Sequence, residues 1–306
     1  MVAEFIIPEE TKNKISSRLL RFRKQFSITS ELNNIDNIVS AVKQSFETQR
    51  FNKFSANHSK DIKYLEIGVG LGGNLINSLK AGYDIVGLEP GDTKEVCGRY
   101  DLCAELMQAN GIVDIESRLV KGVVEALPFD DKTFDFVFSI AVLEHVKNVR
   151  KALQEMNRVL KDRGIMYMNI PNYNSFYEGH YDMLWLPYVL LNKGVAKFYL
   201  RLRGRDSSFV DSLNFITPYN IMRLAKKEFK GGSFDCYPHI KGPLSIFGLI
   251  YFAHKTNTMN RYSATKSLEQ SVVMRTVSFI VSSIVVKSYI LLGFAKTFNF
   301  IYFKKG

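Results

Sequence analysis

The chain is poor in cysteine, and its cysteines form no disulfide framework. Its 306 residues include only Cys97, Cys103 and Cys236, which cannot all pair with one another and form no CxxC motif. They indicate buried, reduced thiols of a cytosolic protein. The first residues, MVAEFIIPEE, lack the basic start and long apolar core of a signal peptide, and no internal repeat or low-complexity linker follows. These absences favour a globular protein of the cytoplasm.

Acidic residues are outnumbered, with 30 Asp and Glu against 41 Lys and Arg and a formal net charge of +11. The excess is concentrated between Lys12 and Lys60 and between Lys193 and Lys230. Such patches suit phosphate-bearing partners, either nucleic acid or an anionic membrane surface, and they fit a solvated basic face equally well. With 46% apolar residues, the chain has enough hydrophobic side chains for a folded core.

Strand and helix patterns alternate between residues 61 and 171, which predicts a parallel sheet covered by helices. Before this region, apolar spacing around Ile15 and around Ile38 predicts two amphipathic helices. A further helix is predicted for Pro218–Glu228. The predicted strands are Lys63–Ile67, Asp84–Leu88, Ser117–Val120, Phe134–Ser139 and Ile165–Ile170.

The pattern divides the chain into four parts. Residues 1–60 form a helical extension and residues 61–171 the core. Residues 172–217 form an aromatic, basic insertion, and residues 218–306 contain a helix and a long apolar tract.

The stretch YLEIGVGLGGNL, from Tyr64 to Leu75, places four glycines directly after an apolar run. A strand, a glycine turn and a new helix form a ligand-binding arrangement, because bare backbone can approach the ligand and the helix offers free N–H groups. A tight turn without a ligand is the alternative. Glu89, at the end of the next strand, can accept two hydrogen bonds from a ribose diol. Since Gly68, Gly70 and Gly73 also satisfy the GxGxxG fingerprint, these residues alone leave an NAD-type site open.

The segment from Val123 to Asn172 resolves this ambiguity. It contains LPF, then FD before a strand, LEH after that strand, and VLKDRG before the next strand. Together with LEIGVGLGGNL and GLEPG, these motifs resemble the core of class I S-adenosylmethionine-dependent methyltransferases of the small-molecule "type 11" group. The resemblance covers about Tyr64 to Pro171, a third of the chain. It implies a Rossmann-like α/β fold with a mostly parallel seven-stranded sheet, helices on both faces and an antiparallel last strand.

The resemblance also implies roles for individual residues. The acid Glu66 lies where the family binds the methionine amino group, and Glu89 where it binds the ribose. Many relatives have an Asp that binds adenine where this chain has Val123, so the backbone of Val124 and the carboxylate of Glu125 are the candidates for that role. The implied residues that bind S-adenosyl-L-methionine are Glu66, Gly68, Gly70, Gly72, Glu89, Val124, Glu125 and Ser139.

His145 is the candidate catalytic residue, as a general base or as a group that orients the acceptor, because imidazole titrates close to neutral pH. The alternative is that Glu144 and His145 only cap the helix after the fourth strand. Some quinone-modifying relatives bind a metal with an extra carboxylate before this pair. Here that position is Ala141, so no metal is predicted. His180 and Tyr181 in the insertion are candidate substrate contacts.

The insertion combines aromatic, apolar and basic residues in MLWLPYVLLNKGVAKFYLRLRGR, a composition typical of a helix on an anionic membrane surface. We therefore expect a methyltransferase acting on a small or membrane-proximal acceptor, such as a cell-surface saccharide or a lipid-linked molecule. The alternatives are a non-enzymatic membrane-associated or complex subunit with this fold, and an NAD-type oxidoreductase, for which no nicotinamide-binding motif is found. Nucleic acid is disfavoured as a substrate because no NPPY-like motif follows the fourth strand.

The C-terminal tract has two interpretations. Thr276 to Ala295 is long enough to span a bilayer and carries one formal charge, Lys287. In the preferred interpretation, Phe234–Pro238 and Thr297–Lys305 are the paired strands that close the sheet, and the apolar tract forms helices that pack beside the core or lie in the membrane interface. The protein is then expected in the cytoplasm, free or at the membrane surface.

Overall fold

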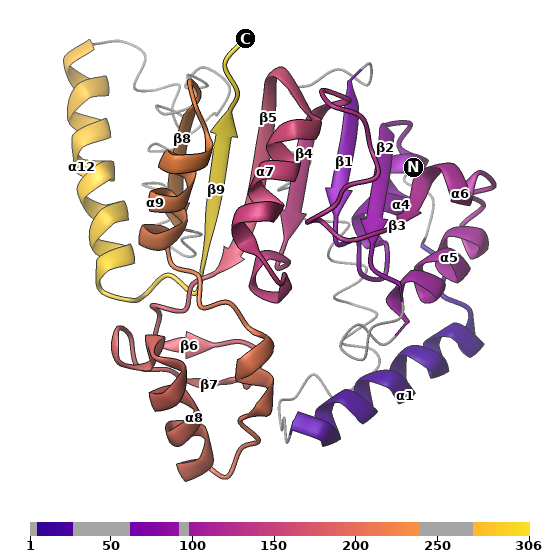
Figure 1. Cartoon of the computed structure of the whole chain (residues 1–306), viewed down its shortest axis with the longest axis horizontal. Coiled ribbons are helices and arrows are strands. Elements are labelled where there is room, and N and C mark those ends of the chain that lie inside the picture. The colour runs from indigo at the N-terminus through magenta and orange to yellow at the C-terminus, as the bar shows by residue number, and fades with distance from the viewer. Residues whose placement is uncertain (1–4, 27–61, 92–97, 239–271) are drawn as a thin grey trace.

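The computed structural model describes residues 5–26, 62–91, 98–238 and 272–306 (Figure 1). Its centre is a seven-stranded sheet with the strand order β3-β2-β1-β4-β5-β9-β8. The strands are β1 (Lys63–Ile67), β2 (Asp84–Glu89), β3 (Leu119–Lys121), β4 (Phe134–Ile140), β5 (Leu160–Pro171), β8 (Ser233–Pro238) and β9 (Thr297–Phe303). In this order, the neighbouring strands β3, β2, β1, β4 and β5 pair in parallel. Strand β9 lies between β5 and β8 and is antiparallel to both. The predicted fold class is confirmed.

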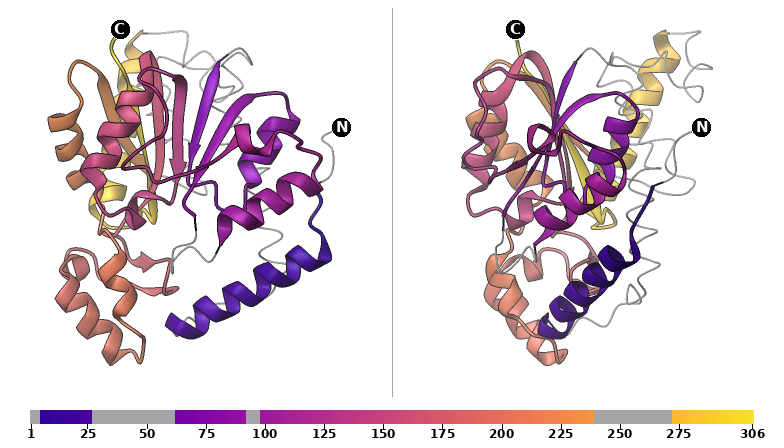
Figure 2. Two further views of the ribbon diagram at one scale, coloured as in Figure 1. Left: turned by 45° about the vertical axis from the view of Figure 1, so that its right-hand side comes forward. Right: turned by 90° about the vertical axis from the view of Figure 1, so that its right-hand side faces the viewer.

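Helices cover both faces of the sheet (Figure 2). On one face, α7 and α9 pack through Met156 and Ile221 into a core that includes Val137 and Phe300. On the other, α4 and α5 pack through Leu75 and similar side chains. The helices are α1 (Glu9–Phe26), α4 (Gly73–Lys80), α5 (Arg99–Ala109), α6 (Ile115–Arg118), α7 (Val149–Val159), α8 (Lys193–Leu202), α9 (Pro218–Glu228) and α12 (Val272–Leu291). The described residues also form the 3-10 turns η1 (Leu143–His145), η2 (Val189–Leu191) and η3 (Ser208–Ser212).

The sequence predicts most of these elements and misplaces two strands. Residues 117 and 118 belong to the helical turn α6, where Ser117 and Arg118 both bond to Asp114, so the predicted strand Ser117–Val120 is wrong at its start. Strand β5 begins at Leu160, five residues before its predicted start. A shift in register lets Phe134 pair with Leu160 and Phe136 with Ile165, which places a bulge at the start of β5.

The C-terminal segment returns to the sheet, as the preferred interpretation predicts. Strand β9 pairs with both neighbours, and α12 packs against the sheet through Val286 and Ile290. Within the described part of the chain, no helix has both the length and the hydropathy needed to cross a membrane. Cys103 and Cys236 are free and buried. Cys97 and the second predicted N-terminal helix, around Ile38, lie outside the described residues.

Two segments lie beyond the carboxyl ends of the parallel strands, at the bottom of Figure 1. One is α1, which is tied to the start and middle of α5 by hydrogen bonds from Arg18 to the Gly98 carbonyl and from Thr11 to Glu105. The other is the insertion, which contains a hairpin of β6 (Tyr177–Glu178) and β7 (Met183–Leu184), followed by α8. The insertion has its own apolar core around Trp185, Leu200 and Val210. The carboxyl ends of β1, β2 and β4 therefore face these two segments (Figure 1).

Candidate active site

The glycine loop follows β1 and is held against the end of β2. The N–H groups of Gly68 and Val69 donate to the carbonyl of Leu88, and the N–H of Gly70 donates to the Glu89 carboxylate over 2.8 Å. Gly70 has a φ of 59°, and a Cβ built there would meet no atom within 4 Å from the described part of the chain beyond its two neighbours. By contrast, a Cβ at Gly68 would overlap Val142 and one at Gly72 would overlap Cys103. The loop is therefore tightly packed on two sides and open at Gly70.

Two buried carboxylates flank this opening. Glu66 is 4% exposed and Glu89 2% exposed. Asn74 donates to one oxygen of Glu66, whereas the other oxygen is buried without a hydrogen-bond partner among the described residues. Burial raises the pKa of Glu66 to about 8 and that of Glu89 to about 6, although the Gly70 N–H opposes the shift at Glu89. A ligand with a cationic group at Glu66 and hydroxyls at Glu89 would restore the charged carboxylates.

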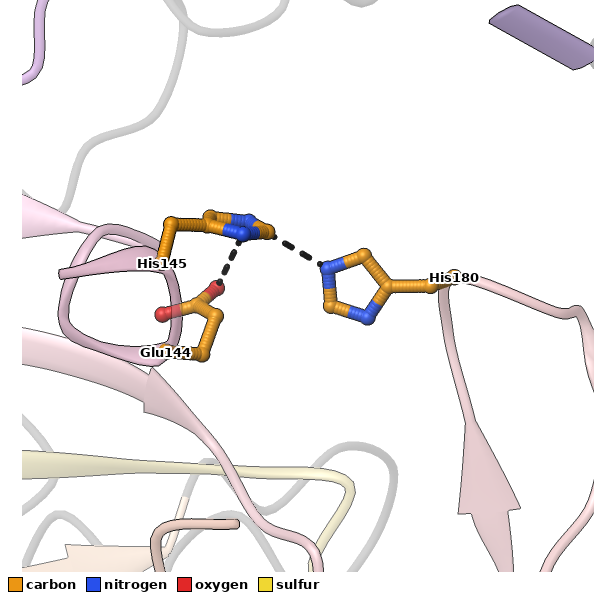
Figure 3. A group of neighbouring side chains, drawn as sticks. All are labelled: Glu144, His145 and His180. Carbon is orange, nitrogen blue, oxygen red and sulfur yellow. Dashed lines mark hydrogen bonds and ion pairs between the residues drawn. The ribbon is translucent and has the colours of Figure 1, made fainter. Parts of the chain in front are cut away.

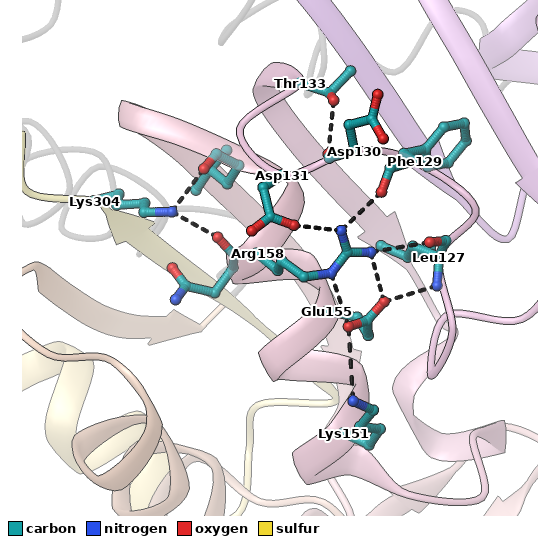
Figure 4. A network of polar contacts seen from close by, with 11 residues as sticks. Leu127, Phe129, Asp130, Asp131, Thr133, Lys151, Glu155, Arg158 and Lys304 are labelled. Atoms are coloured by element: carbon teal, nitrogen blue, oxygen red, sulfur yellow. Dashed lines mark hydrogen bonds and ion pairs between the residues drawn. The ribbon is translucent and has the colours of Figure 1, made fainter.

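The segment that follows β3 is fixed by a polar network from α7 (Figure 4). Glu155 accepts the N–H of Leu127, and Arg158 donates to the carbonyls of Leu127 and Phe129. Arg158 also pairs with Glu155 and with Asp131. These charge-assisted contacts lower the pKa of Glu155 and hold the backbone of the LPF motif in one position.

Three of the predicted cofactor residues, Ser139, Val124 and Glu125, lie at the end of β4 or in the segment that follows β3. Ser139 is buried at the end of β4, and Val124 is buried in the main core. Glu125 accepts hydrogen bonds from the N–H groups of Lys147 and Asn148 at the start of α7. Its carboxylate therefore has backbone partners of its own, and Val124 is the nearer candidate for an apolar contact with adenine.

The turn η1 brings Glu144 and His145 to the carboxyl edge of the sheet, directly after β4. Asn214 fixes this turn, since its backbone N–H donates to the carbonyl of Glu144 and its amide donates to those of Leu143 and Val146. Asn148, rather than this pair, accepts the capping hydrogen bond at the start of α7. The η1 turn is therefore positioned by the end of the insertion.

His180 reaches His145 from the insertion, across 35 residues of sequence (Figure 3). The two Nε2 atoms lie 3.4 Å apart, and Glu178 accepts a 2.6 Å hydrogen bond from Nδ1 of His180. Surrounding protein lowers the pKa of His145 to about 3, with His180 and Arg99 acting in the same direction, while the ring keeps an exposed edge. Burial opposes the charge on His180, but its bond to Glu178 raises its pKa. The role of His145 as a base stays a prediction.

Tyr181, the second candidate substrate contact, lies in a different environment. Its side chain is 1% exposed and belongs to the core of the insertion, and its N–H donates to Glu178. Tyr181 thus helps to hold the carboxylate that orients His180. Of the two candidates in the insertion, only His180 reaches His145.

A family model described as "Methyltransferase domain" matches residues 65–168, the segment that contains the glycine loop, both carboxylates and the His145 turn. Residues 65–168 are a class I methyltransferase domain of the type 11 group. S-adenosylmethionine is the cofactor of this family, and the residues present fit it. Glu66 has one oxygen without a hydrogen-bond partner among the described residues, which can accept from the amino group. Gly70 leaves space for the cofactor, and the buried carboxylate of Glu89 can accept from the ribose diol.

Full-length relatives extend beyond the part that this chain matches. The chain is 29% identical over 189 residues to the uncharacterized protein Rv1509 of Mycobacterium tuberculosis, covering 56% of this chain and 60% of that protein. It is 28% identical over 130 residues to the sterol 4-C-methyltransferase strm-1 of Caenorhabditis elegans, covering 41% and 37%. It is 30% identical over 102 residues to the uncharacterized methyltransferase YcgJ of Bacillus subtilis, covering 33% and 38%. The matched region thus spans less than two thirds of each relative.

Several residues that support the site could not be assigned from the sequence. Asn74 on α4, Glu155 and Arg158 on α7, and Asn214 at the end of the insertion all position backbone or carboxylates at the site. Glu155 and Arg158 are three residues apart on one helix, a spacing typical of an ion pair. Their contacts with Leu127 and Phe129 depend on how the helix packs, so no local sequence pattern predicts these contacts.

Replacing Glu66 by Gln is expected to stabilise the cofactor-free protein more at high pH than at low pH. The folded-state pKa of about 8 lies above the ordinary 4.5, so the group's contribution is present below pH 4.5 and is lost as the pH rises toward 8. The neutral amide is not subject to this loss, which is about 5 kcal/mol in full and roughly 3 kcal/mol between pH 5.5 and pH 8.5. Thermal unfolding of both proteins at pH 5.5, 7 and 8.5 measures it.

Glu116, an exposed acid on α6, provides the control. Glu116→Gln should leave the pH dependence of unfolding unchanged. An equal pH dependence in the wild-type and Glu66→Gln proteins would contradict the burial of a charged carboxylate beside the glycine loop.

Proposed function

We propose that the protein is an S-adenosylmethionine-dependent methyltransferase whose acceptor is a lipid-like or lipid-linked molecule at an anionic membrane surface. The observation that carries the catalytic part is the pair of buried carboxylates at the glycine loop, one with an unpartnered oxygen. Sequence similarity to the methyltransferase domain supports the same assignment. The acceptor class rests on the surface of the insertion and of α12.

The cofactor supplies an activated methyl group, so the protein has mainly to place the acceptor in line with it. Glu66 would bind the amino group of the cofactor and Glu89 its ribose. The bare backbone of Gly70 would leave space for the cofactor between them. The η1 turn and His180 lie beyond the ends of β1 and β4, where an acceptor would approach. The Arg158 network would keep the adenine side of the site in one conformation, which favours in-line placement.

The insertion exposes an apolar surface that continues to the end of α12. Phe176 contacts Phe294 with ring centroids 5.9 Å apart, and the Tyr188 hydroxyl donates to the carbonyl of Leu291. The Tyr199 hydroxyl on α8 donates to the carbonyl of Leu184, which joins the helix to the same surface. The exposed members are Phe176, Leu184, Leu186, Tyr188, Val189, Val195, Phe198, Leu202, Leu291, Leu292 and Phe294. We call this set the insertion surface.

Two further features favour a membrane as its partner. Four cations lie on or beside α8, namely Lys193, Lys197, Arg201 and Arg203. In addition, the outer side of α12 exposes apolar residues with helical spacing, which continue toward the insertion surface. These are Val277, Ile280, Val281, Ile284 and Leu291. Apolar side chains bordered by Lys and Arg are typical of surfaces that enter the headgroup region of anionic bilayers.

Methyl transfer from radiolabelled S-adenosylmethionine tests the proposal. Full-length protein is incubated separately with a lipid extract and with an aqueous metabolite extract of cells that lack it. The expected result is label in the lipid fraction. Label confined to the aqueous fraction would contradict the acceptor class, whereas failure to bind S-adenosylmethionine would contradict the enzymatic function.

Flotation with vesicles tests the membrane contact separately. The protein should float with vesicles of phosphatidylcholine and phosphatidylglycerol, and less with phosphatidylcholine alone. Combining Phe198→Glu with Leu202→Glu should lower the bound fraction by at least roughly tenfold, because two apolar side chains leave the bilayer. Val113→Glu is the matched control, since Val113 is 94% exposed in the turn between α5 and α6. Binding that is unchanged in the double variant would contradict this contact.

A further inference from the structure

Three side chains with metal-binding atoms meet at the carboxyl edge of the sheet, outside the cofactor-binding loop. Glu144 and His145 come from η1, and His180 comes from the insertion. One ligand atom from each lies within 4.8 Å of the others. Figure 3 shows that both η1 side chains and His180 point toward a common space. The sequence predicts no metal because Glu144 and His145 alone give too few ligands, and the fold adds the third.

The spacing of these atoms fits a small divalent cation. Bonds of about 2.0–2.1 Å in a tetrahedral site place neighbouring ligand atoms roughly 3.3–3.4 Å apart. The Nε2 atoms of His145 and His180 are 3.4 Å apart, and Nε2 of His145 is 3.8 Å from a carboxylate oxygen of Glu144. The ligand atoms of Glu144 and His180 lie within 4.8 Å of each other, so the Glu144 carboxylate would move toward the two rings to complete three coordination bonds.

The hydrogen bonds around the cluster leave the Glu144 carboxylate unsatisfied. Glu178 accepts a hydrogen bond from Nδ1–H of His180, so in the neutral ring the Nε2 lone pair faces His145. If Nε2 of His145 carries a proton, it can donate a hydrogen bond to Nε2 of His180. Glu144 is 0% exposed, and neither of its carboxylate oxygens receives a hydrogen bond from the described residues. A buried carboxylate without donors is costly unless a cation neutralises it.

The surroundings also resemble those of catalytic metal sites. In such sites a carboxylate accepts a hydrogen bond from the histidine nitrogen that does not bind the metal, which fixes the ring and increases its basicity. Glu178 is in this position relative to His180. Phe209 packs against both rings, with centroids 6.1 and 5.4 Å from those of His145 and His180. The His145 side chain is 38% exposed and that of His180 19%, which leaves an open side for a fourth ligand.

We infer that Glu144, His145 and His180 bind one divalent transition-metal ion, oriented by Glu178 and open on one side to an acceptor. Two imidazoles and one carboxylate suit Zn²⁺, whereas Mg²⁺ prefers an all-oxygen set. Binding of the ion does not depend on the proposed function, but its use in orienting an acceptor oxygen or nitrogen does. A histidine that holds the ion through Nε2 is a ligand, so this assignment replaces the predicted base role of His145.

Cobalt titration of the metal-free, full-length protein tests the inference at pH 8, where the ligands are free of competing protons. The expected result is one Co²⁺ per chain, with visible absorption bands that disappear when one equivalent of Zn²⁺ is added. His180→Ala and Glu144→Gln should each weaken binding by at least roughly 100-fold, and Glu178→Gln by about 10- to 100-fold.

Asp182→Asn is the matched control, because Asp182 lies two residues from His180 but bonds to the Tyr177 hydroxyl instead. Its metal affinity should equal that of the wild type. Circular dichroism confirms folding, and His145→Ala replaces any variant that fails to fold. Absence of stoichiometric binding in the wild type, or unchanged binding in folded His180→Ala, overturns the inference. Titration of the same samples with S-adenosylhomocysteine shows separately whether the cofactor site is intact.

Discussion

Gly70→Asp is expected to abolish binding of S-adenosylmethionine while the protein stays folded. Apart from its chain neighbours, no atom of the described residues lies within 4 Å of the position that a Cβ would occupy, so the new side chain extends into the space we assign to the cofactor. Its charge would also lie near Glu89, whose carboxylate accepts the Gly70 N–H. Calorimetric titration should give an affinity at least roughly 100-fold weaker than that of the wild type, a loss of about 2.7 kcal/mol or more.

Gly111→Asp separates this effect from backbone strain. Gly111 also has a positive φ, 79°, and open space around its Cβ position, but it lies in the turn after α5. Both variants should lose similar stability, and only Gly70→Asp should lose the cofactor. Undiminished binding by folded Gly70→Asp would show that the glycine loop does not hold S-adenosylmethionine.

Removing residues 297–306 is expected to prevent formation of a stable domain. Strand β9 pairs along its whole length with β5 and from Phe298 to Phe303 with β8, and its deletion would unpair both. It also carries four fully buried large side chains, Phe298, Phe300, Ile301 and Tyr302. Losses of about 3–5 kcal/mol for each of the three aromatics sum to roughly 9–15 kcal/mol, which is comparable to the whole 5–15 kcal/mol that stabilises a typical domain. Soluble yield, circular dichroism and cofactor binding should all be lost.

A graded version avoids reliance on an insoluble truncation. Phe300→Ala should destabilise the protein by about 3–5 kcal/mol, because Phe300 lies in the main core against Phe229 and Phe234. Lys305→Ala, at an exposed position just beyond β9, should change the stability by less than about 0.5 kcal/mol. A truncated protein that remains folded and binds cofactor would contradict the role of β9 in closing the sheet.

The sequence predicts the sheet well where apolar runs have sharp boundaries. Lys63–Ile67 and Pro218–Glu228 have the predicted limits, because a glycine loop ends the strand and Thr217 with Pro218 begins the helix. The sequence wrongly predicts a strand at residues 117 and 118, because local apolar content does not reveal the hydrogen bonds from Ser117 and Arg118 to Asp114. The register between β4 and β5 is set by pairing of residues far apart in the sequence, and no local sequence pattern predicts it.

The candidate site is predictable only in part, for the same reason. Glu66 and Glu89 can be identified because each stands at a fixed place relative to a strand end. The contact between His145 and His180 joins residues 35 positions apart, and it depends on how the insertion folds over the carboxyl edge of the sheet. Likewise, the sequence presents Tyr181 as another aromatic of a surface loop, whereas it is buried in the insertion's own core.

Calorimetric titration of the unmodified full-length protein with S-adenosylmethionine, S-adenosylhomocysteine, NAD and NADP tests the central claim most directly. The predicted result is one site per chain for each of the first two ligands and no heat of binding with either nicotinamide cofactor. A folded protein that binds neither S-adenosylmethionine nor S-adenosylhomocysteine, or that binds NAD at the Gly70-sensitive site, would contradict it.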